Sequence, residues 1–227
     1  MTKLSERRND ILRALTATVL ILATDLAVYY LTKPNSSATH LIDMSIALDD
    51  YIPFVPQFVL IYILTFAFWC IAPLIIIRTG IGRFSDFFAT AVISLIICGI
   101  FFLLLPATVT RPDIIPATAA ERILVIIYDS DAPTNLFPSI HCLLTWICWI
   151  AVRRQCTVSP WIRLAVFVFT LLVCASTVLI RQHVIVDFFA AVVVAECVWF
   201  FVRVTGISAP ARKAFTRLPE IFFNNKR

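Results

Sequence analysis

Long runs of apolar residues dominate this chain of 227 residues. They lie at about 11–32, 57–78, 84–105, 140–153, 161–180 and 184–204. Most of these runs approach the ~20 residues that a helix needs to cross a bilayer. The pattern therefore predicts an all-α, polytopic membrane protein with six transmembrane helices.

The fourth run, 140–153, is short for a span, and Ser139 and His141 stand at its beginning. Polar groups are tolerated at membrane depth where they face protein or a water-filled pocket. We therefore expect the start of this helix to border a polar pocket.

Two further segments are too polar or too short to span a membrane. Residues 41–56, which contain Asp49 and Asp50, predict a re-entrant or interfacial element before the second span. Thr118 and Glu121 have the spacing of a capping box, which predicts a short apolar helix through about Tyr128. We expect short interfacial helices on one side of the membrane.

Composition and charge extend this picture. With 60% apolar and 15% charged residues, the chain is expected to form a single membrane-embedded domain over residues 1–227. Basic residues flank alternate ends of the runs, which places residues 1–10 and the tail 205–227 in the cytoplasm. The prediction is a multi-pass protein of the cell membrane with its histidine-bearing loops on the outer side. The net charge of +5 is explained by these flanks, so we expect no nucleic-acid partner.

Two of the three histidines stand in polar interruptions of the apolar runs. His141 ends the segment Pro138-Ser139-Ile140-His141, and His183 precedes Asp187 by four residues. A carboxylate at this spacing orients an imidazole, and a second histidine can supply the complementary proton transfer. The pair indicates covalent chemistry at a membrane surface. The cysteines and histidines lack the spacing of a metal site, so no metal and no cofactor are expected.

Three short motifs in order resemble those of the type 2 phosphatidic acid phosphatase superfamily. They are Arg111-Pro112, then Pro138-Ser139-Ile140-His141, then Ser176-Thr177 followed by His183 and Asp187. The resemblance implies that His183 attacks phosphorus, that Asp187 orients it and that His141 protonates the leaving alkoxide. It further implies that Arg111 and Ser139 hold the phosphoryl oxygens.

The chain departs from this pattern at two cationic positions. Leu104 stands where the family has a lysine, and Thr177 stands where its third motif has an arginine. Each charge-assisted hydrogen bond is worth about 1.5–3 kcal/mol, so the loss favours a singly charged phosphodiester over a phosphomonoester. The thinned third motif is similar to those of inositol phosphorylceramide synthases and sphingomyelin synthases. Candidates for compensation are the cations Arg181 and Arg122 and the neutral donors Gln182 and Asn135.

The leading hypothesis is a lipid phosphatase that acts at the outer leaflet through a phosphohistidine, with a lipid phosphate as substrate and membrane lipids as surroundings. One alternative is a lipid headgroup phosphotransferase, and another is a non-catalytic lipid-binding or flipping protein. Two further ionisable residues, Asp25 and Glu196, fall within predicted spans. Each is expected to be hydrogen-bonded inside the bundle or protonated, although a proton path is an alternative.

Overall fold

The computed structural model describes residues 3–33 and 40–223 and is almost entirely helical in its regular structure. The extreme ends of the two predicted cytoplasmic segments, residues 1–2 and 224–227, lie outside this range. The α-helices are α1 (Lys3–Thr32), α2 (Val59–Ile76), α3 (Ile81–Leu104), α4 (Ala119–Ser130), α5 (Ile140–Val152), α6 (Pro160–Leu179), α7 (Ile185–Thr205) and α8 (Ala209–Phe223). The short elements are the strands β1 (Ile42–Asp43) and β2 (Ala107–Thr108) and the 3-10 helices η1 (Asp49–Tyr51), η2 (Pro56–Phe58) and η3 (Ile77–Thr79).

Five helical segments in the described ranges are long and apolar enough to cross a membrane. They are Lys3–Thr32, Pro56–Thr79, Ile81–Leu104, Pro160–Leu179 and Ile185–Thr205. The structure is therefore consistent with the predicted all-α membrane protein. The sixth expected span is α5, a helix of 13 residues that is shorter than the others.

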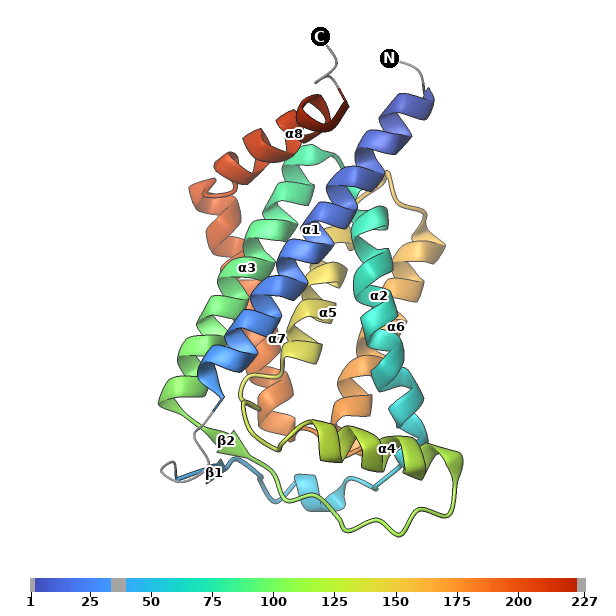
Figure 1. Cartoon of the computed structure of the whole chain (residues 1–227), viewed down its shortest axis with the longest axis vertical. Coiled ribbons are helices and arrows are strands. Elements are labelled where there is room, and N and C mark those ends of the chain that lie inside the picture. Colours follow the sequence, from blue (N-terminus) through green and yellow to red (C-terminus); the bar gives the residue numbers. More distant parts are fainter. Residues whose placement is uncertain (1–2, 34–39, 224–227) are drawn as a thin grey trace.

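The short helix α5 lies in the middle of the bundle. It packs against α2, α3, α6 and α7, and nine of its 13 residues are buried (Figure 1). Trp69 of α2 donates a hydrogen bond from Nε1 to Oγ1 of Thr145 on α5 at 3.1 Å. Because protein surrounds α5, it can bring polar residues to membrane depth.

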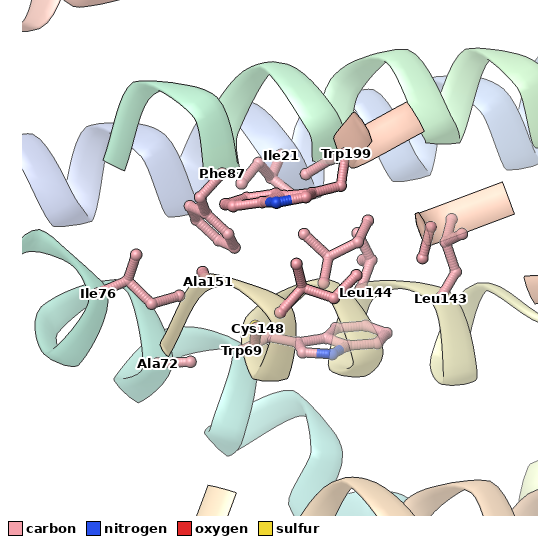
Figure 2. Close-up of a cluster of buried hydrophobic side chains, with 14 of the residues drawn as sticks. Ile21, Trp69, Ala72, Ile76, Phe87, Leu143, Leu144, Cys148, Ala151 and Trp199 are labelled. Carbon is pink, nitrogen blue, oxygen red and sulfur yellow. The ribbon is translucent and has the colours of Figure 1, made fainter. Parts of the chain in front are cut away.

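The main apolar core forms around this central helix. Figure 2 shows Leu144 and Cys148 of α5 between the indole rings of Trp69 on α2 and Trp199 on α7. Leu144 and Cys148 are both nearly inaccessible to solvent. This packing fixes the position of α5 relative to the helices on both of its sides.

Both strands, η1, η2 and α4 gather at the end of the bundle opposite the two termini (Figure 1). There β1 pairs with β2 in parallel, with Ile42 opposite Ala107. The predicted capping box is present, since Glu121 N donates to Thr118 Oγ1 and Thr118 N donates to a Glu121 carboxylate oxygen. The helix that it opens, α4, buries Leu124 in one apolar cluster with Val59 and Tyr62 of α2. α4 thus covers this end of the bundle.

The helix α8 follows the last span in a segment for which the sequence predicted no element. Phe215 on α8 is buried against Phe84 and Phe88 of α3, with ring centroids 5.2 and 5.1 Å apart. Arg13 of α1 donates from Nε to the Phe215 carbonyl at 2.9 Å. α8 is amphipathic and carries no long apolar run, so a search for such runs misses it.

Candidate active site

His183 is held in one orientation by Asp187. The Nδ1 atom of His183 lies 3.1 Å from Oδ2 of Asp187, and both side chains are buried. The same Oδ2 accepts a hydrogen bond from the backbone N–H of Val184 at 3.1 Å. Nε2 of His183 makes no hydrogen bond with any residue that the structure describes, so it is free to face a substrate.

The charge of Asp187 also changes the acidity of His183. Burial lowers the pKa of His183, but the hydrogen bond and the negative charge of Asp187 raise it by more. The pKa of His183 is therefore above its usual value near 6.5. The arrangement favours an imidazole whose Nδ1 carries a proton and whose Nε2 is available as a nucleophile.

The turn between α6 and α7 places His183 beside the cavity. The carbonyl of Thr177 accepts hydrogen bonds from the backbone N–H groups of Gln182 and His183, both at 3.0 Å. Oδ1 of Asp49 accepts from the N–H of Ile185 at 2.9 Å and so caps the first turn of α7. These bonds fix the backbone on both sides of His183.

His141 lies in the first turn of α5 and faces His183. The two ring centroids are 6.2 Å apart. The His141 ring stacks on Tyr62 with centroids 4.3 Å apart, and Phe66 and Trp69 also border it. Nε2 of His141 is buried and has no hydrogen-bond partner among the described residues. The ring is thus positioned by aromatic packing and keeps one nitrogen available.

A cavity of about 390 Å³ connects the two histidines. Helices α1, α2, α4 and α5 and the loop 131–136 form its walls, together with Gln182 and His183. Three wall residues, Leu26, Tyr30 and Phe66, are 55%, 67% and 49% exposed, so the cavity opens sideways along α1 and α2. Its apolar walls and this opening suit a ligand with a hydrocarbon part.

Arg111 reaches the site through Gln182. One Arg111 η nitrogen donates to Oε1 of Gln182 at 2.6 Å, and the other donates to the carbonyls of Tyr128 and Asp131 at 3.2 and 2.6 Å. Burial lowers the pKa of Arg111, although a guanidinium stays protonated at neutral pH. Nε2 of Gln182 is buried, unpaired within the described residues and part of a cavity-lining side chain. Gln182 is therefore a candidate donor to a bound phosphoryl group.

The other predicted site residues occupy less direct positions. Ser139 is buried at the N-cap of α5, where its hydroxyl accepts from the N–H of Cys142 at 3.4 Å and its own N–H donates to the Asp187 carbonyl at 3.2 Å. Arg181 donates to the carbonyls of Asp49 and Ile52 at 2.9 and 2.8 Å and does not line the cavity. Arg122 is exposed on α4. Of the proposed replacements for the missing cations, Gln182 and Asn135 alone line the cavity.

In the part of the chain that the structure describes, no cation takes the place of the family's lysine at Leu104 or of its arginine at Thr177. Leu104 is 71% exposed at the end of α3. Thr177 is fully buried, with its hydroxyl donating to the Cys174 carbonyl at 2.9 Å. Among the described residues that line the cavity, there is no lysine or arginine.

The two ionisable residues within spans have different surroundings. Glu196 accepts hydrogen bonds from Arg153 at 2.6 and 2.9 Å and from Trp146 at 3.1 Å, as expected for a residue paired inside the bundle. Asp25 lines the cavity and makes no hydrogen bond or ion pair with the described part of the chain. The sequence did not predict that Asp25, Asp49 and Tyr62 lie near the two histidines, because these contacts join distant parts of the chain.

A comparison with protein families identifies the class of protein. A model described as the PAP2 superfamily matches residues 38–201. The chain therefore belongs to the PAP2 superfamily, whose fold is that of phosphatase-type lipid phosphoesterases and whose members are generally phosphatases or phosphotransferases. The matched region contains both histidines, and α1 lies outside it. No curated protein and no solved structure matches the chain.

Proposed function

We propose that this protein is an integral membrane phosphatase that hydrolyses a lipid phosphate or diphosphate through a covalent intermediate on His183. The observation that carries the proposal is that His141 and His183 face one cavity with ring centroids 6.2 Å apart. Reacting atoms meet at about 3–3.5 Å, so one phosphoryl group fits between the two rings. This spacing weighs against a lipid carrier without catalysis.

The chemistry follows from the two imidazoles. Nε2 of His183 attacks phosphorus while the bond from phosphorus to the lipid oxygen breaks, and protonated His141 gives its proton to that oxygen. Asp187 stabilises the positive charge that develops on His183. Water then attacks the phosphohistidine, His141 accepts a proton from this water, and phosphate leaves with His183 restored.

The bundle end that carries the termini is also the basic end, which supports placing the cavity at the outer leaflet of the cell membrane. In this arrangement both termini are cytoplasmic. The unpaired amide nitrogen of Gln182 donates to the phosphoryl oxygens, and Arg111, which does not itself line the cavity, holds Gln182 in place from behind. Ser139 stabilises the start of α5.

The second candidate function is transfer of a phosphoryl headgroup to another lipid. Two observations favour it. The cavity opens sideways along α1 and α2, where a second lipid can enter, and its described lining holds no lysine or arginine to neutralise a doubly charged phosphate. Both functions use His141, His183 and Asp187, and they differ in whether water or a lipid hydroxyl resolves the phosphohistidine.

The test is to incubate the purified protein, without added divalent metal, with phosphatidic acid, an isoprenyl diphosphate, and choline- or inositol-phosphate lipids. Release of inorganic phosphate supports hydrolysis, and a new phosphodiester lipid supports transfer. His183→Ala should abolish either product together with an acid-labile phosphoryl label on the protein. His40→Ala is the matched control, because His40 is exposed and does not line the cavity. Equal activity of wild type and His183→Ala would rule out the proposed nucleophile.

A further inference from the structure

A second polar cavity lies at the end of the bundle that carries the termini. Its volume is about 360 Å³, and it lies between the start of α3, the end of α5 and the last turns of α7. The lining residues are Arg83, Arg153, Arg154, Glu196, Trp199, Phe200 and Arg203. His141 and Arg153 are at opposite ends of α5, so at 1.5 Å per residue this basic cavity is about 18 Å from the candidate active site.

The positive charges of this basic cavity exceed the negative charges around it. Glu196 accepts two hydrogen bonds from Arg153, and Arg203 lies 3.6 Å from the Asp86 carboxylate. Arg83 and Arg154 have no carboxylate partner among the described residues. Four arginines and two carboxylates leave two positive charges in surplus.

One arginine of this cavity, Arg83, is already held in place. Nε of Arg83 donates to the carbonyl of Ala151 at 2.8 Å, and the guanidinium carbon lies 5.1 Å from the centroid of the Trp199 ring. These contacts leave the η nitrogens of Arg83 without a described partner. A guanidinium fixed through its Nε presents its remaining donors in a defined direction, which suits a phosphate.

The cavity also has an apolar side. Trp199 is 8% exposed and lines the cavity beside Arg83, whereas the neighbouring Phe200 is 69% exposed on α7. Because α7 is apolar enough to cross the membrane, the exposed Phe200 faces lipid near the end of this span. The basic cavity is therefore continuous with a surface that contacts hydrocarbon.

We propose that this basic cavity binds the headgroup of an anionic phospholipid. The phosphate would lie between Arg83 and Arg154, and an acyl chain would run along Phe200. Basic pockets between transmembrane helices bind such headgroups, and each cation near the membrane surface adds about 1 kcal/mol of attraction to anionic lipid. The site is independent of the proposed phosphatase activity, since no residue lines both cavities.

Membrane topology alone does not account for this arrangement. The positive-inside rule requires basic residues on a flank, and any exposed position satisfies it. Here arginines from three separate parts of the chain border one cavity, where like charges repel unless an anion is bound. A bound phosphate removes that repulsion.

The test measures the thermal unfolding midpoint of the full chain in nanodiscs of phosphatidylcholine alone and of equal parts phosphatidylcholine and phosphatidylglycerol. Binding to the folded state raises the midpoint in the anionic discs. The double variant Arg83→Gln/Arg154→Gln should lose most of this rise, and added salt should reduce it in the wild type. Arg212→Gln/Lys213→Gln is the matched control, because both residues are exposed on α8 at the same end and carry the same charge.

Each variant is compared with itself in the two membranes, so a general loss of stability does not affect the result. If the double variant fails to fold, Arg154→Gln alone gives the same comparison, because its guanidinium has no partner in the described structure. An unchanged rise in the Arg83/Arg154 variant, or an equal loss in the control, would overturn the proposal. A rise produced by inorganic phosphate in phosphatidylcholine discs would assign the cavity to a soluble anion and overturn the lipid assignment.

Discussion

The Arg111 guanidinium donates a hydrogen bond to the side-chain oxygen of Gln182 at 2.6 Å, and this contact joins the first and third sequence motifs. Gln182 is 1% exposed and precedes His183 directly. Its oxygen is used by Arg111, and its nitrogen is unpaired among the described residues. The Gln182 amide therefore offers a hydrogen-bond donor to the cavity. It does so five residues after Thr177, the position at which the third family motif has an arginine.

Replacing Gln182 should impair both stability and substrate binding. In Gln182→Ala, the half-buried Arg111 loses one charge-assisted partner, which costs about 1–3 kcal/mol of unfolding free energy. The substrate also loses a donor, so KM should rise more than kcat falls. Gln182→Glu is the companion variant, because its carboxylate neutralises Arg111 and repels phosphate. A Gln182→Glu enzyme with wild-type KM would exclude Gln182 from phosphate binding.

Replacing His141 should slow the reaction most for substrates whose alcohol is a poor leaving group. Loss of a general acid lowers rates by about 10²–10⁴-fold when the leaving group needs a proton. His141→Ala should therefore lose most activity on an alkyl lipid phosphate and much less on an aryl phosphate such as p-nitrophenyl phosphate. The check is the ratio of kcat/KM values for the two substrates, because kcat/KM reports formation of the phosphohistidine and not its later hydrolysis, which His141 also assists. An equal loss on both would assign His141 a purely structural role in its stack with Tyr62.

The pH dependence of kcat/KM should report the state of His183. His183 must lose a proton before Nε2 can attack, so the rate rises with pH through its pKa, which Asp187 holds above 6.5. In Asp187→Asn the two largest raising effects, the hydrogen bond to the carboxylate and its negative charge, disappear while burial still lowers the pKa of His183. The rising limb of the pH profile of kcat/KM should then move to lower pH. Its maximum should also fall, because the His183 ring loses its orientation. A limb at the wild-type position in Asp187→Asn would show that another group controls it.

The sequence predicted the features that depend on local patterns. Apolar runs marked the spans, and the fourth, short run coincides closely with α5. The capping box at Thr118 marked the start of α4, and the motif spacing identified the two histidines that share the cavity. Each of these signals lies within a few neighbouring positions, so a single sequence reveals it.

The features that the sequence did not predict depend on contacts between distant segments. Arg181 and Gln182 are adjacent candidates for the phosphate, yet Arg181 bonds to a carbonyl 132 positions away at Asp49, and Gln182 faces the cavity. Asp49 stabilises the first turn of α7 from 136 positions away. The choice between such neighbours is made by tertiary packing, which residue spacing does not encode.

Asp25 links this tertiary packing to a final prediction. It belongs to α1, lines the cavity with both histidines and has no described partner. A charged residue within a span costs about 2.5–3.5 kcal/mol on insertion scales, and such residues mark functional sites by default. Asp25→Leu should therefore raise the thermal unfolding midpoint while lowering activity on the lipid substrate, and Asp25→Asn should restore part of the activity by keeping a polar side chain. Lower stability of Asp25→Leu with unchanged activity would instead show that Asp25 supports the bundle.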